Sequence, residues 1–379
     1  MPQWLVRVVV PTPFGVGPVN VYLLPGPPVT LVDAGPDTPQ ALSALESALA
    51  GQGLGVRDVE RVLLTHTHPD HAGLAGRLEE LGAAVYLHPA DAHRLAPGGL
   101  SLAPRVPLLR WAGVPEVEIE RLRRQAERNQ GFVRPAGRPR PLEPGQAVEF
   151  EGFRLKVLHT PGHSLGHLCF WGGPGQPELL AGDCLLPRIS PNPLLELADA
   201  GGRGGGGGLG AAEGRDMLSG SGLGAVAGEA PAAGGDGAQP PPRRYPSLER
   251  YLVSLEGLFG LEVDRVHPGH GEPFCDHRRA IAALRWHHWA RLRRLARFLG
   301  SEPRSPWELA DRLFPGVGGW ERFLAVSEVV AHLSLLAHEG RALEEIGGDG
   351  VVRYRRPASG GPGKKGQAVR RESHDREGS

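Results

Sequence analysis

The chain has 379 residues, of which 40% are apolar and 22% charged, as in an ordinary globular protein. Its 42 basic and 42 acidic residues cancel, so no overall field attracts it to nucleic acid or to an anionic membrane. Three cysteines give no disulfide framework, the N-terminal stretch lacks a signal-peptide pattern, and no apolar run approaches the ~20 residues that cross a bilayer, so we expect a cytoplasmic protein with no membrane partner.

The first half of the chain alternates apolar strand-like runs with amphipathic helices. In the second helix, Asp70 is well placed as the N-cap and Gly82 as the C-terminal stop. Residues 95–143 are less regular, apart from a predicted helix over 116–130 with a mixed surface. The strands are expected over 4–10, 20–24, 29–35, 61–65 and 84–88, and the helices over 38–51 and 70–82.

The second half returns to strands and then becomes helical. Residues 199–242 are rich in Gly, Ala and Pro and have no periodicity, so a disordered insertion is predicted there. Around this insertion we expect strands over 154–160, 168–171, 178–183 and 263–267, and a helix over 248–260.

The C-terminal part has the element order of a winged helix. Three helices are expected from about residue 278, and 341–355 resembles a two-stranded wing. His287 and His288 lie in the first, arginine-rich helix and are expected to be partly exposed. The predicted domains are therefore a catalytic domain over 1–280 and a winged-helix-like domain over 281–356, followed by a disordered tail over 357–379.

Side chains that can coordinate a metal gather just past the ends of five predicted strands. Loops at one edge of a sheet converge to form a site, and stray histidines would have no reason to prefer these positions. The residues are Asp33, then His66, His68, Asp70 and His71, then His163, Asp183 and His270.

The spacing within residues 65–73 has a physical reason. Alternate residues of an extended segment point the same way, so the imidazoles of His66 and His68 can reach one ion. Asp70 and His71 then turn into the helix and point elsewhere, as a second ion would require. Neutral imidazole with carboxylate is the ligand set expected for zinc, with iron or manganese as alternatives.

Five motifs, in this order, resemble the metallo-β-lactamase superfamily. The resemblance covers roughly 1–280 without the Gly-rich insertion, and no ligand position is substituted. Within the family, the third and fourth motifs are most similar to the glyoxalase II-like and winged-helix-bearing branch. The motifs are LVDAG (31–35), THTHPDHAG (65–73), TPGHSLGH (160–167), AGDCLL (181–186) and HPGHG (267–271).

The resemblance implies an α+β fold, a four-layer αβ/βα sandwich, with a two-metal site at one edge. By the same resemblance, Asp70 would also steer a hydroxide or a proton as a catalytic residue, and Asp33 would orient a histidine or backbone group unless it is a plain turn aspartate. Two divalent ions would acidify a shared water near neutral pH. The first ion would be held by His66, His68 and His163, the second by Asp70, His71 and His270, and Asp183 would bridge them.

Three functions agree with these motifs. The first is hydrolysis of an ester-like or thioester-like small molecule, since members of this branch cleave thioesters. The second is a phosphodiesterase or endoribonuclease that uses the same ions on single-stranded RNA, and the third is a mononuclear iron oxygenase similar to persulfide dioxygenases. Glyoxalase II has a different C-terminal domain, so glutathione itself is not assigned, and the oligomeric state is not predicted.

Overall fold

The computed structural model describes residues 4–198 and 242–358 of the chain. The segments predicted to be disordered, 199–242 and 357–379, lie outside these residues except at their edges. The helices are α1 (Pro39–Ala50), α2 (Pro69–Ala72), α3 (Ala75–Glu80), α4 (Pro89–Ala92), α5 (Val106–Trp111), α6 (Glu116–Gln130), α7 (Ser247–Phe259), α8 (His277–Phe298), α9 (Pro306–Leu313) and α10 (Gly319–His338), with short 3-10 helices η1 (Val56–Asp58), η2 (His93–Leu95) and η3 (Ala103–Arg105).

The strands form two mixed sheets and one hairpin. In the first sheet, ordered β1-β2-β3-β4-β5-β6, the pairs from β3 to β6 are parallel. In the second, ordered β11-β10-β9-β8-β7, only β10 and β11 are parallel. The strands are β1 (Val6–Val10), β2 (Val19–Leu24), β3 (Thr30–Val32), β4 (Arg61–Leu63), β5 (Ala84–Leu87), β6 (Arg140–Pro141), β7 (Ala147–Phe150), β8 (Phe153–His159), β9 (Leu168–Gly172), β10 (Glu178–Gly182), β11 (Arg265–Pro268), β12 (Leu343–Ile346) and β13 (Val352–Arg355).

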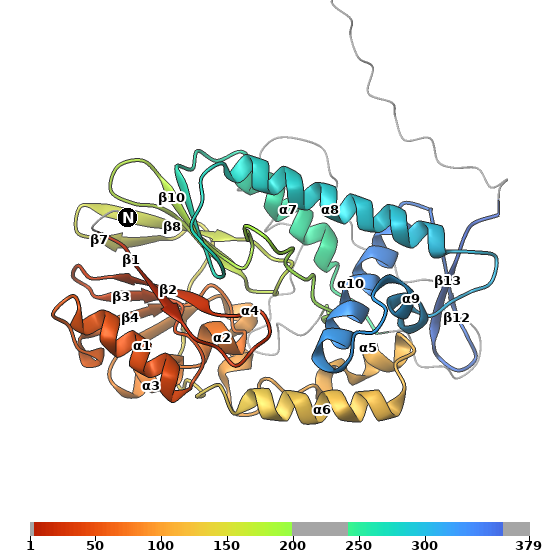
Figure 1. Cartoon of the computed structure of the whole chain (residues 1–379), viewed down its shortest axis with the longest axis horizontal. Coiled ribbons are helices and arrows are strands. Elements are labelled where there is room, and N and C mark those ends of the chain that lie inside the picture. The colour runs from red at the N-terminus through yellow and green to blue at the C-terminus, as the bar shows by residue number, and fades with distance from the viewer. Residues whose placement is uncertain (1–3, 199–241, 359–379) are drawn as a thin grey trace, which may run out of the picture.

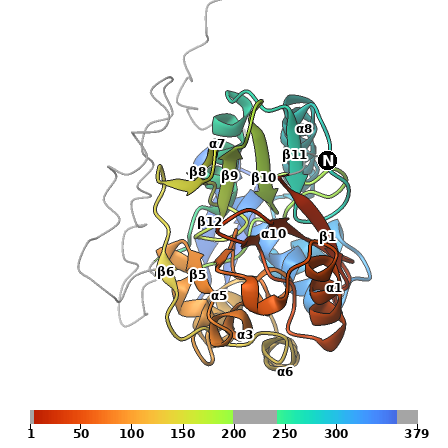
Figure 2. The same ribbon diagram turned by 90° about the vertical axis from the view of Figure 1, so that its left-hand side faces the viewer.

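The two sheets pack face to face between two layers of helices, which is the predicted αβ/βα sandwich (Figures 1 and 2). Leu63, Leu155 and Phe170 belong to the apolar cluster between the sheets. Helices α1 and α3 cover the outer face of the first sheet, and α7 with the start of α8 covers the outer face of the second. Both sheets therefore bury their two faces, which explains the near-continuous apolar runs of their central strands.

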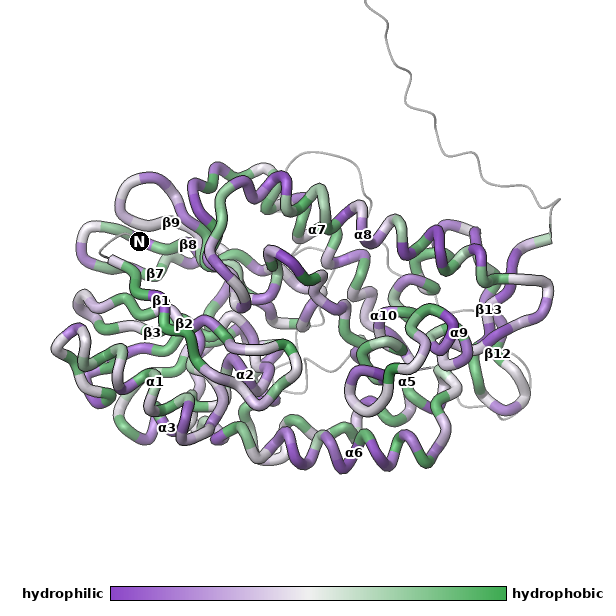
Figure 3. Tube along the Cα trace, in the orientation of Figure 1, coloured by the Kyte–Doolittle hydropathy of each residue, from purple (hydrophilic) through white to green (hydrophobic). Residues whose placement is uncertain are grey.

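A further apolar cluster lies beside the sandwich and joins the middle of the chain to its C-terminal part. It takes side chains from 102–126, among them Leu109 and Ile119, and from 292–354, among them Leu333 and Tyr354. Helix α6 turns one apolar face toward this cluster, and Figure 3 shows hydrophilic residues along much of its remaining surface. The C-terminal helices α8, α9 and α10 thus share an apolar core with part of residues 95–143, the region with the less regular sequence pattern.

Some predicted elements differ from those observed. The helix expected over 70–82 is split into α2 and α3, and α2 begins at Pro69. His68 is therefore the N-cap position, and the carboxylate of Asp70 lies in the first turn rather than capping the helix. Strand β7 and helix α5 were not predicted. Among the described residues, no helix is both long enough and apolar enough to cross a bilayer.

The C-terminal element order agrees with the expected one. Helices α8, α9 and α10 are followed by the antiparallel hairpin of β12 and β13. The classification of this part as a winged helix, and the domain boundaries, stay predictions.

Candidate metal centre

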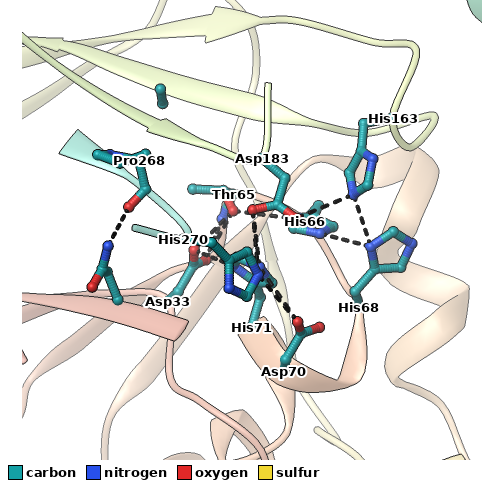
Figure 4. Close-up of polar contacts among 12 residues, drawn as sticks. Asp33, Thr65, His66, His68, Asp70, His71, His163, Asp183, Pro268 and His270 are labelled. Carbon is teal, nitrogen blue, oxygen red and sulfur yellow. Dashed lines mark hydrogen bonds and ion pairs between the residues drawn. The ribbon is translucent and has the colours of Figure 1, made fainter. Parts of the chain in front are cut away.

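The structure brings all of the predicted site residues together at one edge of the two sheets (Figure 4). They arrive on the loops that follow β3, β4, β8, β10 and β11, because the C-terminal ends of these strands meet there. Every predicted ligand is buried or nearly so. The group comprises Asp33, His66, His68, Asp70, His71, His163, Asp183 and His270.

Three imidazoles form the first cluster. The Nδ1 atom of His68 lies 2.8 Å from Nε2 of His66 and 3.0 Å from Nε2 of His163. The rings approach edge to face rather than stacking, so that their nitrogens converge on one point. This triad has the ligand number and type of a three-histidine zinc site.

The second cluster combines Asp70, His71 and His270. The Oδ2 atom of Asp70 lies 3.3 Å from Nε2 of His270 and 4.0 Å from Nε2 of His71. Asp70 reaches the cluster because it lies in the first turn of α2, immediately after the extended stretch that carries the first two histidines. The change from extended backbone to helix thus lies between His68 and Asp70, while His66 also comes within 4.8 Å of His71 and Asp183.

Asp183 lies between the clusters and contacts both. Its Oδ2 atom is 3.5 Å from Nε2 of His163, and its Oδ1 atom is 3.3 Å from Nε2 of His71 and 3.7 Å from Nε2 of His270. One carboxylate thus presents a separate oxygen to each group of imidazoles.

Hydrogen bonds to Nδ1 fix the tautomer of four of these histidines. The Nδ1 atoms of His163 and His270 face the carbonyl oxygens of Asn192 and Pro18, at 3.2 and 2.8 Å. Because a carbonyl only accepts, each ring donates from Nδ1 and keeps a lone pair on Nε2.

The other two histidines are fixed by acceptors on neighbouring loops. His71 faces the Asp33 carboxylate through Nδ1 at 2.8 Å, and His66 faces the Thr65 hydroxyl through Nδ1 at 3.0 Å. That hydroxyl donates in turn to Asp33, whose oxygens lie 2.9 and 3.0 Å away. All four rings therefore turn the lone pair of Nε2 toward the centre of the site.

This arrangement fits divalent cations and is poorly satisfied by protein groups alone. The Nε2 atoms of His71 and His270 and Oδ1 of Asp183 are buried and have no hydrogen-bond partner among the described residues. When the two rings are neutral, with the proton on Nδ1, each of these atoms is an acceptor aimed at other acceptors, and buried polar atoms are rarely left in this condition. A shared cation would satisfy all three, and the mixed imidazole and carboxylate set is one that zinc prefers.

The pKa shifts reflect the same crowding of acceptors. Burial lowers the pKa of His66 and His68, and neighbouring histidines lower it further. Burial alone would also lower the pKa of His71 and His270, but Asp183 and the other carboxylates outweigh it and raise both values. Burial acts to raise the pKa of Asp183, yet His71 and His270 hold it well below its usual value.

Backbone conformation brings the ligand loops into contact. Asp33 has a left-handed φ of 62°, a conformation that Asp tolerates better than most residues, and its carboxylate also accepts from the Thr65 amide at 2.8 Å. At Gly269 a Cβ atom would lie 2.7 Å from Cε1 of His71 and still closer to Asp183. The first glycine of the HPGHG motif is therefore required by the close approach of two ligands.

Sequence reasoning missed three residues that support the site. Thr65 stands inside the 65–73 motif, and its position before the first histidine was a usable signal. Asp91 accepts from the Ser164 hydroxyl at 2.9 Å and so braces the loop that carries His163. Asn192 contributes a backbone carbonyl from an irregular segment, and no sequence signal marks it.

Comparison with known proteins agrees with this geometry. Residues 14–270 match the model of the metallo-beta-lactamase superfamily. "Probable metallo-hydrolase YqjP" of Bacillus subtilis is 31% identical over 342 residues, which cover 88% of this chain and 92% of that protein. The crystal structure of a metallo-beta-lactamase family protein from Thermus thermophilus has 33% identity and a TM-score of 0.68, and the match covers 93% of this chain and 99% of that one.

A more local match reaches an enzyme with a named substrate. The hydroxyacylglutathione hydrolase of Pseudomonas putida is 30% identical over 126 residues, which cover 33% of each chain. The family match and the clusters of histidine and aspartate together indicate that this protein uses divalent metal. The chain therefore belongs to the metallo-β-lactamase superfamily and is a metallohydrolase of that fold.

Proposed function

We propose that the protein is a dinuclear zinc hydrolase that cleaves an ester-like or thioester-like bond in a small molecule. The observation that carries this proposal is the position of Asp183, whose two oxygens face two separate clusters of imidazoles. A single-ion site would not need a second group of buried acceptors on the far side of that carboxylate. His66, His68 and His163 would hold one ion, and Asp70, His71 and His270 would hold the other.

The chemistry supplied by a bound pair of ions is a hydroxide at neutral pH and polarisation of the substrate carbonyl. The protein's own contribution is geometric. Hydrogen bonds at Nδ1 hold four imidazoles with Nε2 free, and Asp33 keeps His71 in the required tautomer. Asp70 has one oxygen beside His270 and would use the other to accept or return a proton at the reacting water.

The substrate class rests on two supports. The glyoxalase II-like motifs favour an acyl group on sulfur, and the local match to a hydroxyacylglutathione hydrolase points to the same chemistry. That match covers only a third of either chain, so the carrier that bears the acyl group is not assigned to glutathione.

We further propose that the C-terminal part is a winged-helix module that borders the substrate site. Its element order supports this, and so does the pairing of Arg304 with Tyr354, which extends the hairpin of β12 and β13 by a bridge to the segment before α9. The module would restrict entry to small molecules. Single-stranded RNA is the alternative partner, with the same ions acting on a phosphodiester.

The decisive experiment combines metal analysis with a substrate panel. Purified protein is assayed for metal content and for turnover of an S-acyl glutathione, another S-acyl thiol, phenyl acetate, bis(p-nitrophenyl) phosphate and single-stranded RNA. We expect two zinc ions per chain and turnover of a thioester or ester. The His68→Ala variant is expected to lose at least ~100-fold in kcat, whereas His93→Ala, an exposed histidine outside the site, should retain wild-type turnover.

Other outcomes would replace the proposal. One iron per chain with oxygen consumption would identify the oxygenase alternative. Turnover restricted to the phosphodiester or to RNA, lost in His68→Ala, would identify the nuclease. Full turnover in His68→Ala would remove the metal mechanism for that substrate.

A further inference from the structure

An irregular segment, 190–196, connects one histidine of the metal centre to the C-terminal helices. We propose that Asn192 is a positioning residue: its backbone carbonyl orients His163, and its side chain ties that carbonyl to α10, so that ion affinity depends on the C-terminal helices. This inference rests on the proposed metal site. It assigns a role to a part of the chain that lies outside the family motifs.

The first link is the contact with the ligand itself. Nδ1 of His163 donates to the carbonyl of Asn192 at 3.2 Å, while Nε2 faces His68 and Asp183. Rotation of the ring, or the opposite tautomer, would take the lone pair of Nε2 away from the ion position. The carbonyl therefore fixes the tautomer and ring orientation in which His163 can bind an ion, as hydrogen-bond acceptors of metal-binding histidines generally do.

The second link holds the carbonyl in place. Nδ2 of Asn192 donates to the carbonyl of Leu324 in α10 at 2.9 Å. Prolines precede and follow Asn192, which restricts the local backbone to extended conformations. Leu194, two residues further on, is buried in the cluster that contains the C-terminal helices. The segment is thus stiff, and its position is set by the helices it touches.

A third contact involves a buried pair of histidines, His288 of α8 and His332 of α10. The Ser190 hydroxyl lies 3.2 Å from Nε2 of His288, Nδ1 of His288 lies 3.3 Å from Nε2 of His332, and Nδ1 of His332 donates to the Glu328 carbonyl at 2.7 Å. Because the Glu328 carbonyl only accepts, His332 donates from Nδ1 and accepts at Nε2 from Nδ1 of His288. His288 in turn accepts at Nε2 from the Ser190 hydroxyl, so every ring nitrogen has a partner.

This chain of hydrogen bonds explains why His288 is buried, contrary to the expectation of partial exposure. Burial lowers the pKa of His288 and of His332 to about 3, so both rings are neutral, as this series of hydrogen bonds requires. The Glu328 carboxylate, which lies nearby, is already paired with Arg291. The cluster is therefore a satisfied connection between helices, and it fixes the N-terminal end of the segment at Ser190.

The test measures ion affinity in two variants that leave the backbone carbonyl present. Asn192→Ala removes the hydrogen bond to Leu324, and Asn192→Asp removes the donor at nearly constant size. Stepwise zinc affinity is determined by competition with a chelator for the full-length protein. We expect one of the two steps to weaken by ~10–100-fold and the other to change by less than ~3-fold, with turnover recovering when zinc is in excess.

A matched control and a spectroscopic measurement separate positioning from general damage. Asn129→Ala removes a side-chain hydrogen bond at the end of α6 and should leave both zinc steps unchanged. In the ion-free wild type, 15N spectra should show His163 protonated at Nδ1, and in Asn192→Ala a mixture of tautomers.

Unchanged zinc steps in both Asn192 variants, in a wild type that binds two ions, would overturn the inference. Equal weakening of both steps together with a loss of unfolding free energy in the ion-free protein would also overturn it, because that result indicates a structural role alone. A wild type that binds no zinc would instead overturn the proposed function.

Discussion

Replacement of Asp33 by Asn tests whether a carboxylate that touches no ion controls the metal centre. Its Oδ1 atom accepts from the Thr65 amide and its Oδ2 atom from Nδ1 of His71, each at 2.8 Å. An amide side chain has only one acceptor oxygen. In either orientation its NH₂ group therefore faces a buried N–H donor, either that of Thr65 or that of His71.

Only one rearrangement of the protons relieves this conflict at a low cost in free energy. The Thr65 amide cannot lose its proton, but His71 can move its proton from Nδ1 to Nε2 and accept from the side-chain amide introduced at position 33. That tautomer places a proton on the atom that faces Asp183, 3.3 Å away, where an ion would bind. Loss of a buried hydrogen bond to a charged group costs about 1.5–3 kcal/mol, which corresponds to roughly a 10–100-fold weaker zinc affinity.

The assay is chelator competition with purified Asp33→Asn, alongside Asp37→Asn as a control. Asp37 lies four residues away and accepts from Arg77 outside the site, so the same chemical change there should leave both zinc affinities unaltered. The second ion position should weaken in Asp33→Asn, and kcat should fall with it at limiting zinc. Wild-type affinity at both positions in Asp33→Asn would refute the tautomer argument.

Three further predictions follow from the same geometry. Gly269→Ala places a Cβ atom against Asp183 and 2.7 Å from Cε1 of His71, so zinc affinity should fall at least ~10-fold in chelator competition. Carboxylates raise the pKa of His71 and His270 above the usual 6.5 in the ion-free protein. The protons on these two rings therefore stabilise the ion-free fold fully below about pH 6.5, and this stabilisation is lost as pH rises through the raised pKa values, which urea unfolding would measure. Zinc affinity should increase over the same pH interval, because zinc displaces these protons, which zinc titration would measure. Phe170→Ala empties space between the sheets and should lower the free energy of unfolding by about 3–5 kcal/mol in urea.

Each of these has a matched comparison. At Gly260 a Cβ atom would meet its nearest neighbour atom only at 3.7 Å, so Gly260→Ala should retain zinc affinity, and equal losses in the two glycine variants would contradict the contact argument. For the pH dependence, zinc affinity that is constant from about pH 5.5 to about pH 8.5 would exclude displaced protons. For the core, Val9→Ala on the exposed side of β1 should change stability by less than about 0.5 kcal/mol.

The convergence of the candidate ligands at one edge of the sheets was predictable because its determinants are local. Asp33, the ligands of residues 65–73, and His163, Asp183 and His270 each follow a strand that its apolar run identifies. Once the strands are known to meet at one edge, the convergence of their loops requires no knowledge of distant contacts. Helix α6 was predictable for a similar reason, since its apolar positions repeat on one face.

The supporting structure could not be predicted in this way. Helix α2 ends after one turn, with Gly73 in contact with the backbone of residues 36–37 and 132, a contact that no periodicity announces. The carbonyl behind His163 comes from Asn192, whose position depends on packing against a helix more than a hundred residues later. Backbone carbonyls carry no residue-type signal, so contacts of this kind emerge only from the tertiary fold.

Local determinants place the ligands, whereas distant contacts place some of the groups that orient them. Strand-end ligands can be retained while the segments around them change, because each ligand follows its own strand and four of the histidines need only one Nδ1 acceptor. In this protein one of those acceptors, the carbonyl of Asn192, belongs to a segment packed between the sandwich and the C-terminal helices. With the proposed roles of Asn192 and of the C-terminal part, a change in those helices would alter ion affinity at His163 as well as the shape of the substrate entrance. Exchange of the C-terminal part for that of a relative should shift both properties together, and a chimera with new substrate preference but unchanged zinc affinity would show that the two are independent.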